Sequence, residues 1–217
     1  MLDDPEMKPA PKAPRENYHH GDLRGALISA ADAILAESGV EGFTLRAAAR
    51  RAGVSPAAPA YHFSSVRGLL TEVAILGYEE LQRHIEIDGF AGDDTALLRR
   101  QAAGYVRFAL TYPGRFRVMF RPDLHLVEDE RLHQAAYAAM GQLAATVCRR
   151  AQLPLSPQPE PRVVAAVLAA WSQAHGIAQL FLDGKLNGFA GATTPQEAAD
   201  RLLDDVLAEA WPERGHK

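Results

Sequence analysis

Four arginines in a segment without carboxylates are the residues of this sequence with the clearest chemistry. Arg46, Arg50, Arg51 and Arg67 fall within residues 42–71, which contain no Asp or Glu. The whole chain is acidic, with a net charge of -4 at pH 7, so the positive charge is local. Such a local positive field is typical of a surface that contacts phosphate groups. A solvated basic face of an ordinary helical bundle is the alternative interpretation.

Residue types that support catalysis are present, but not in a catalytic arrangement. The eight histidines include His19 and His20 near the N-terminus and an Asp123-x-His125 pair. None has the helical spacing of a metal-binding HExxH motif, and there is no glycine-rich phosphate loop. The one cysteine, Cys148, excludes an intramolecular disulfide and a multi-cysteine metal site. We therefore expect no cofactor, no metal and no enzymatic activity, with a helical enzyme as a minor alternative.

The composition indicates a folded cytoplasmic protein. The 217 residues are 47% hydrophobic and 23% charged, which excludes a wholly disordered chain and suits one or two packed domains. The longest apolar run, 163–171, is about half as long as a bilayer crossing requires. The N-terminal residues lack the apolar segment of a secretory signal. We therefore expect no membrane association.

The pattern of apolar residues predicts an all-α protein. Ala and Leu outnumber Val, Ile and Thr, and apolar residues recur at helical spacing without sustained alternation. Glycines, prolines and capping residues divide the chain into about nine helices. The expected ranges are 22–38, 45–52, 56–63, 66–87, 95–112, 115–120, 128–151, 162–182 and 194–210.

Three regions are expected along the chain. Residues 1–17 are rich in Pro, Lys and Glu and predict a disordered arm. Residues 18–65 are expected to form a first domain of three helices. Residues 66–217 are expected to form a second helical domain, in which 66–87 is the helix that connects the two.

Residues 44–63 have the pattern of a helix-turn-helix. This motif needs a support helix, a tight turn and a capped recognition helix that enters the major groove of DNA. Thr44 is placed to cap the first helix, and Gly53 to form the turn. Ser55 is placed to cap the second helix, with Pro56 in its first turn. The motif lies inside the basic segment and therefore predicts DNA binding.

The segment from Tyr18 to Leu70 resembles the DNA-binding domain of the TetR family of transcriptional regulators. The matching positions are Thr44, Ala49, Ala52, Gly53, Val54, Ser55, His62, Phe63, Leu69 and Leu70. Two positions depart from the family pattern: Ala60 replaces a tyrosine that contacts DNA in many members, and Val66 replaces a lysine. The resemblance implies a homodimeric regulator, most often a repressor, that binds a palindromic operator in double-stranded DNA.

The resemblance also implies which residues contact the operator. Phosphate contacts would come from Thr44, Arg46, Tyr61, His62 and Arg67. Base contacts would come from the start of the recognition helix, at Ser55, Pro56, Ala57 and Ala58, with Ala60 following in the same helix. These residues offer few hydrogen bonds to bases, so DNA shape and contacts to thymine methyl groups would carry part of the readout.

Later residues resemble one branch of the family, named for a Trp-His-Gly signature in its ligand-binding domain. Trp171, His175 and Gly176 fall in the expected late helix, and residues 112–120 resemble a second segment of this branch. The resemblance implies a small apolar effector. Its candidate contacts are Tyr105, Phe108, Met119, Phe120, Tyr137, Met140, Trp171 and His175. Plain hydrophobic core is the alternative for this set, and a hydrogen-bonded core histidine is the alternative for His175.

The last two long helices are expected to form the homodimer interface. The apolar stripes within 162–182 and 199–210 exceed what one bundle needs to bury, and two such pairs would meet as a four-helix bundle. The sequence thus predicts a dimeric regulator whose operator affinity is lowered by the effector. Ala60 and Val66 leave one alternative open, a DNA-binding-impaired dimer that acts as a ligand-binding or protein-interaction module.

Overall fold

The computed structural model describes residues 23–86 and 90–213. In these ranges the chain folds into helices and their connections, which confirms the all-α prediction. The helices are α1 Leu23–Ser38, α2 Leu45–Arg51, α3 Ala58–Phe63, α4 Val66–His84, α5 Asp94–Thr111, α6 Pro113–Met119, α7 Glu130–Ala151, α8 Pro161–Leu182, α9 Asn187–Ala190 and α10 Pro195–Ala210. The expected disordered arm, 1–17, and the His19-His20 pair lie outside the described residues.

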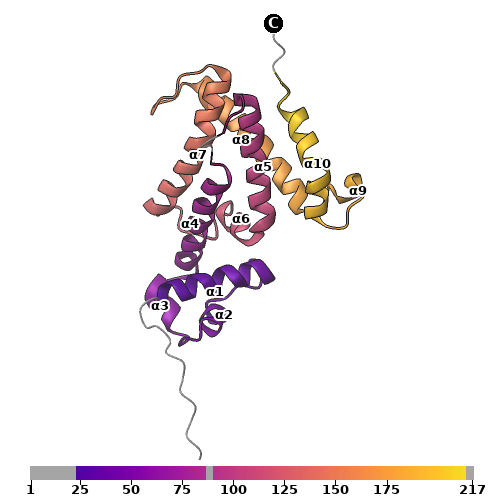
Figure 1. The fold of residues 1–217 in the computed structure, drawn as a ribbon. Helices are drawn as coiled ribbons and strands as arrows, with labels where there is room; N and C mark the ends of the chain where they lie inside the picture. The colour runs from indigo at the N-terminus through magenta and orange to yellow at the C-terminus, as the bar shows by residue number, and fades with distance from the viewer. Residues whose placement is uncertain (1–22, 87–89, 214–217) are drawn as a thin grey trace, which may run out of the picture.

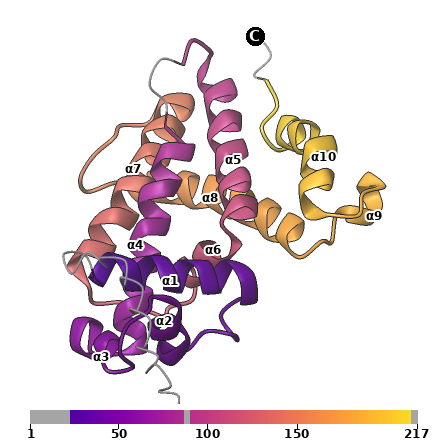
Figure 2. The same ribbon diagram turned by 60° about the horizontal axis from the view of Figure 1, so that its bottom comes forward.

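A small head and a larger body are joined by one long helix (Figure 1). The head consists of α1, α2 and α3, and α4 runs from it into the body. There α4 packs against α5, α6 and α7, while α8 packs against α5 and α7. The pair α9 and α10 lies to one side of the body, where α10 contacts α5 and α8. Figure 2 shows α1 lying across the lower end of the body, with α2 and α3 beyond it.

Polar side chains cap several helices, and the cap by Thr44 confirms a prediction from the sequence. The hydroxyl of Thr44 accepts a hydrogen bond from the Ala47 N–H (3.1 Å) at the start of α2. Ser65 accepts one from the Gly68 N–H (3.0 Å) at the start of α4, and Thr194 caps α10 in the same way. These local bonds satisfy N–H groups that have no partner within the helix.

The start of α3 differs from the prediction. This helix begins at Ala58, with Ala57 in the cap position and no side-chain cap. The expected cap by Ser55 is therefore wrong, and Pro56 stands in a turn rather than in the helix. The Ser55 carbonyl accepts a hydrogen bond from the Ala58 N–H (3.0 Å), which closes this turn before the helix begins.

The four-residue helix α9 has no counterpart in the sequence prediction, which gave about nine helices. Gly184 and Gly191, with φ of +65° and +58°, mark the turns on either side of it. One helical turn is too short to show a repeating apolar pattern, and the glycines around it indicate a loop.

Helix α8 is apolar, but most of its residues are not buried in the core of this chain. By length and composition it could cross a membrane, with a mean hydropathy of 1.3 over a window that is 28% buried. Val163, Val167 and Ala170 are buried against the body, whereas Val164 and Leu168 are exposed. The helix therefore has one packed apolar face and a second apolar face without a partner among the described residues.

Candidate nucleic-acid interface and internal cavity

Helices α2 and α3 form the helix-turn-helix that residues 44–63 predict. Gly53 has a φ of +68° in the connection, a left-handed conformation that glycine adopts without a steric penalty. Ala48, Ala49 and Ala52 are buried. Their small side chains let the support helix pack closely against the rest of the head, which leaves the opposite face of α2 and α3 at the surface.

Most of the predicted DNA contacts are exposed, on or beside α2 and α3 or, for Arg67, at the start of α4. The exposed members are Thr44, Arg46, Ser55, Pro56, Ala57, Ala60, Tyr61 and Arg67, while Ala58 and His62 are half-buried. Tyr61 is 87% exposed, and its ring contacts His62 edge to face. Phe63, next in sequence, is buried in the head. An aromatic side chain so exposed on a short surface helix is free to contact a partner.

The arginines of the basic segment differ in what they contact. Arg46 and Arg50 are exposed on α2 and form no ion pair within the described residues. Arg51 forms two 2.6 Å hydrogen bonds to the carboxylate of Glu37 on α1. The basic segment is therefore partly neutralised by an acid from outside it, and the charge available to phosphate is concentrated at Arg46 and Arg50.

Arg67, predicted as a phosphate contact, is tied to the body of the protein. Its Nε (2.9 Å) and Nη2 (2.5 Å) both donate to the carbonyl oxygen of His125 in the loop between α6 and α7. Next to it, the N–H of Leu126 donates to the hydroxyl of Thr71 (2.9 Å). The loop is thus fastened to the first turns of α4, at the point where this helix leaves the head.

A buried carboxylate connects the head, α4 and the body. Glu72 on α4 is 7% exposed and accepts hydrogen bonds from Arg131 on α7 (2.8 and 3.1 Å). It also pairs with Arg24 on α1 at 2.6 Å. A second bridge joins Arg115 on α6 to Asp32 on α1 (2.8 Å). No sequence pattern signalled these partners, because they are far apart along the chain.

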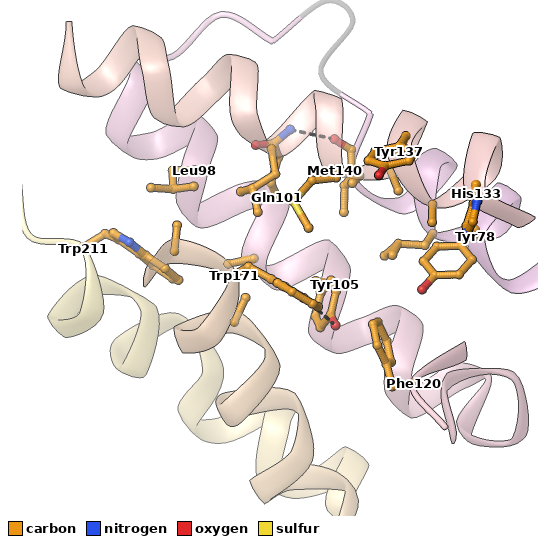
Figure 3. A pocket seen from close by; sticks show the side chains of 18 residues that line it. Tyr78, Leu98, Gln101, Tyr105, Phe120, His133, Tyr137, Met140, Trp171 and Trp211 are labelled. Carbon is orange, nitrogen blue, oxygen red and sulfur yellow. Dashed lines mark hydrogen bonds between the residues drawn. The ribbon is translucent and has the colours of Figure 1, made fainter. Parts of the chain in front are cut away.

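The body contains a cavity of about 240 Å³ between α4, α5, α7 and α8 (Figure 3). The predicted effector contacts that line it are Tyr105, Phe120, Tyr137, Met140 and Trp171. Sequence reasoning missed Tyr78, Gln101, His133 and Trp211, which also line it. Trp211 follows α10, so its place in the wall depends on how that helix packs against α5.

Three predicted effector contacts lie outside the cavity wall. Phe108 is fully buried in the core, and Met119 packs where Gly77 leaves room for its sulfur. His175 lies behind Tyr105, with its ring stacked on Phe116 at 5.2 Å between centroids. These side chains support the wall rather than face the space.

Trp171, Tyr105 and His175 form one hydrogen-bonded group. The Tyr105 hydroxyl accepts from Nε1 of Trp171 (3.4 Å) and donates to Nδ1 of His175 (2.8 Å), which leaves the His175 proton on Nε2. Burial lowers the pKa of His175 and raises the pKa of Tyr105 far above its usual range. Both groups are therefore neutral at physiological pH, and they brace α8 against α5.

Two family models match the chain. The tetR family of bacterial regulatory proteins matches residues 27–73, and a tetracyclin repressor-like C-terminal domain matches residues 98–206. The second match alone spans half of the chain. A search of curated protein sequences found no match to the chain.

Solved structures share this fold over most of the chain. A protein of unknown function from Rhodococcus sp. RHA1 is 28% identical, with a TM-score of 0.66 over 92% of this chain and 100% of that one. The TetR family transcriptional regulator PfmR from Thermus thermophilus is 19% identical, with a TM-score of 0.60 over 88% and 98%. A TetR variant from Acinetobacter baumannii AYE in complex with minocycline is 22% identical, with a TM-score of 0.55 over 86% and 94%.

The family models place the DNA-binding part and the C-terminal part of one kind of regulator in the same order as the head and the body described above. A model that covers half of the chain, together with a second that covers the helix-turn-helix, establishes the relationship. The chain therefore belongs to the TetR family of bacterial transcriptional regulators, which are DNA-binding proteins and not enzymes.

Proposed function

We propose that this TetR-family regulator acts as a cytoplasmic repressor, which binds a palindromic operator as a homodimer and releases it when a small apolar effector enters the cavity. The observation that carries the proposal is the position of α4. This helix starts at the exposed helix-turn-helix and ends in the wall of the cavity, where Tyr78, Leu81 and Ile85 line the space. A ligand in the cavity therefore contacts the helix that carries the head.

The DNA contacts of the proposal are the predicted ones. Arg46 would bind phosphate with the hydroxyl groups of Thr44 and Tyr61, and residues 55–58 would face the bases. Arg67 would reach phosphate with Nη1, since Nε and Nη2 donate to the His125 carbonyl. Tyr61 would replace, from the adjacent position, the family tyrosine that Ala60 lacks.

The dimer of the proposal is formed by α8 and α10. Val164, Leu168 and Leu180 are exposed on α8, a helix whose composition is otherwise that of a buried one. Covering this face with a second copy would give an isologous interface. It would also hold two heads about 34–36 Å apart, the spacing of successive major grooves.

The effector part rests on the cavity and on the Trp-His-Gly signature. The hydrogen bonds from Trp171 through Tyr105 to His175 give the Trp and His of this signature a structural role beside the cavity, which supports membership of that branch. The related TetR variant with minocycline is an instance of a ligand bound within this fold.

Selection of binding sites from a random duplex pool, followed by titration at two salt concentrations, tests the DNA-binding part. We expect a palindrome with steep salt dependence. Arg46→Ala should weaken binding to all sequences and lower the salt slope by about 1, and Arg67→Ala should do the same if its free N–H groups reach phosphate. Arg83→Ala, at the far end of α4, is the matched control and should leave both unchanged.

A protein that binds no DNA sequence would contradict the repressor function. No enriched sequence and no salt-dependent binding, from a protein that is still a dimer by sedimentation, would contradict the repressor function. It would favour the second candidate, a ligand-binding or protein-interaction dimer, which the absence of the family tyrosine and lysine at Ala60 and Val66 already suggests.

A further inference from the structure

The cavity wall contains a polar atom for which the protein supplies no partner. Gln101 on α5 is 2% exposed and lines the cavity. Its Nε2 donates to the carbonyl oxygen of Ile85 (3.1 Å) at the end of α4, shown by a dashed line in Figure 3. Its Oε1 is buried and accepts no hydrogen bond from any residue that the structure describes.

The orientation of this amide follows from its surroundings. Exchanging its nitrogen and oxygen would place a carbonyl oxygen against the carbonyl oxygen of Ile85, so Nε2 must be the atom that faces α4. A buried acceptor without a donor is costly, because its hydration is lost and nothing replaces it. A ligand that donates to Oε1 would recover that loss.

Tyr78, a half-buried residue, also brings its hydroxyl to this wall, where it can donate as well as accept. The Tyr105 hydroxyl accepts from Trp171 and donates to His175. Within residues 23–86 and 90–213, Gln101 Oε1 is thus the one buried side-chain oxygen of this wall that lacks a donor.

The charge of the wall restricts the ligand further. No carboxylate, ammonium or guanidinium group lines the cavity in the described part of the chain. An ionic ligand would lose hydration there, and among these lining residues only the exposed imidazole of His133 could carry an opposing charge, and only toward an anion. Aromatic rings from α4, α5, α7 and α8 surround the space, and these rings offer large apolar contacts to another ring.

We infer that the effector is an uncharged, largely aromatic molecule that donates one hydrogen bond, from an O–H or N–H group, to Oε1 of Gln101. The inference rests on the proposed function, since it takes the cavity as the effector site. Nε2 of the same amide donates to the Ile85 carbonyl at the end of α4. The ligand would therefore bind a side chain that is hydrogen-bonded to the helix connecting body and head.

Three probes that differ in one group test this inference: 4-tert-butylphenol, 4-tert-butyltoluene and 4-tert-butylbenzaldehyde. The first donates a hydrogen bond, the second neither donates nor accepts, and the third only accepts. Binding is measured by tryptophan fluorescence, since both tryptophans of the chain, Trp171 and Trp211, line the cavity. We expect the wild type to bind the phenol about tenfold more tightly than the other two.

Two variants assign the preference to its atom. Gln101→Met keeps the length of the side chain and removes the acceptor, so the three probes should bind within about twofold of one another. Tyr105→Phe removes a different oxygen of the wall, a tyrosine hydroxyl, and there the preference for the phenol should remain. Urea denaturation of each variant verifies that it folds, and the wild-type comparison of probes stands without either variant.

The outcomes separate this inference from the proposed function. Equal binding of all three probes, or a preference that survives Gln101→Met, overturns the role of Gln101 while the cavity remains an effector site. A preference lost in Tyr105→Phe but kept in Gln101→Met assigns the bond to Tyr105 instead. Absence of binding by every probe overturns both the inference and the effector part of the function, whereas operator binding is measured separately.

Discussion

At the scale of single residues, burial determines how two histidines respond to pH. Burial lowers the pKa of His175, and it lowers the pKa of His125, where the guanidinium of Arg67 adds to the effect. Both ring nitrogens of His125 are buried, and the backbone of Met119 and the carboxylate of Asp123 offset the lowering of its pKa only in part. The folded protein therefore resists protonation of both rings, whereas the unfolded chain does not.

This difference predicts a loss of stability in acid. Below about pH 6.5 the unfolded chain binds more protons than the folded one, so the free energy of unfolding should fall as the pH drops from about 7 to 5. Replacing the buried ring by an apolar side chain, in His125→Leu, should flatten this dependence. Urea denaturation at both pH values measures it, and an equally steep dependence in the variant would contradict a role for His125.

Glu72 is the single residue on which the junction of head and body most depends. Its carboxylate is nearly buried, and it forms ion pairs with Arg24 in the head and Arg131 in the body. Glu72→Gln should lower the free energy of unfolding by about 1–2 kcal/mol, because two guanidinium groups lose their charged partner. Glu37→Gln, at an exposed ion pair, is the control and should have little effect in the same denaturant titration.

At the scale of elements, the contact between α6 and α1 depends on a glycine. A Cβ at Gly114 would lie 2.7 Å from the carbonyl carbon of Leu35 and 2.9 Å from its side chain. Helix α6 can therefore approach the head this closely only with glycine at this position. The ion pair of Arg115 with Asp32, from the next residue of α6, fixes the same contact.

Gly114→Ala should separate these two helices. The expected cost is about 1–3 kcal/mol of unfolding free energy, because backbone atoms of α1 must move. Gly141→Ala in α7, where a Cβ would meet nothing within 4 Å, is the matched control and should gain up to about 1 kcal/mol. Thermal denaturation compares the two, and equal stability of both variants would show that α6 and α1 adapt without strain.

At the scale of the whole molecule, the exposed apolar face of α8 is the basis of the proposed dimer. Leu168→Glu would place a charge in the middle of this apolar face. Burying that charge in an interface is costly, so the protein should sediment as a monomer. The variant should bind the operator about a hundredfold more weakly, since two linked heads bind more tightly than one. Val127→Glu, at an exposed apolar residue outside α8, is the control. A dimer that persists in Leu168→Glu would place the interface elsewhere.

The sequence determined the features that depend on neighbours along the chain. The apolar periodicity predicted all the longer helices, and Thr44 predicted where α2 begins, because a cap acts within one helical turn. It also located the basic segment and five side chains of the cavity wall. The start of α3 escaped it, because a Ser-Pro pair suits a turn as well as a helix start.

Only the tertiary structure decided what distant residues do to one another. It paired Arg51 with the carboxylate of Glu37, which lowers the net charge of the head, and it tied Arg67 to the His125 carbonyl, which restricts where that side chain can reach. It placed Trp211 in the cavity wall and left Oε1 of Gln101 without a donor. Such pairings arise from the packing of helices that are far apart in sequence. The spacing of residues within one helix does not indicate which other helices it packs against.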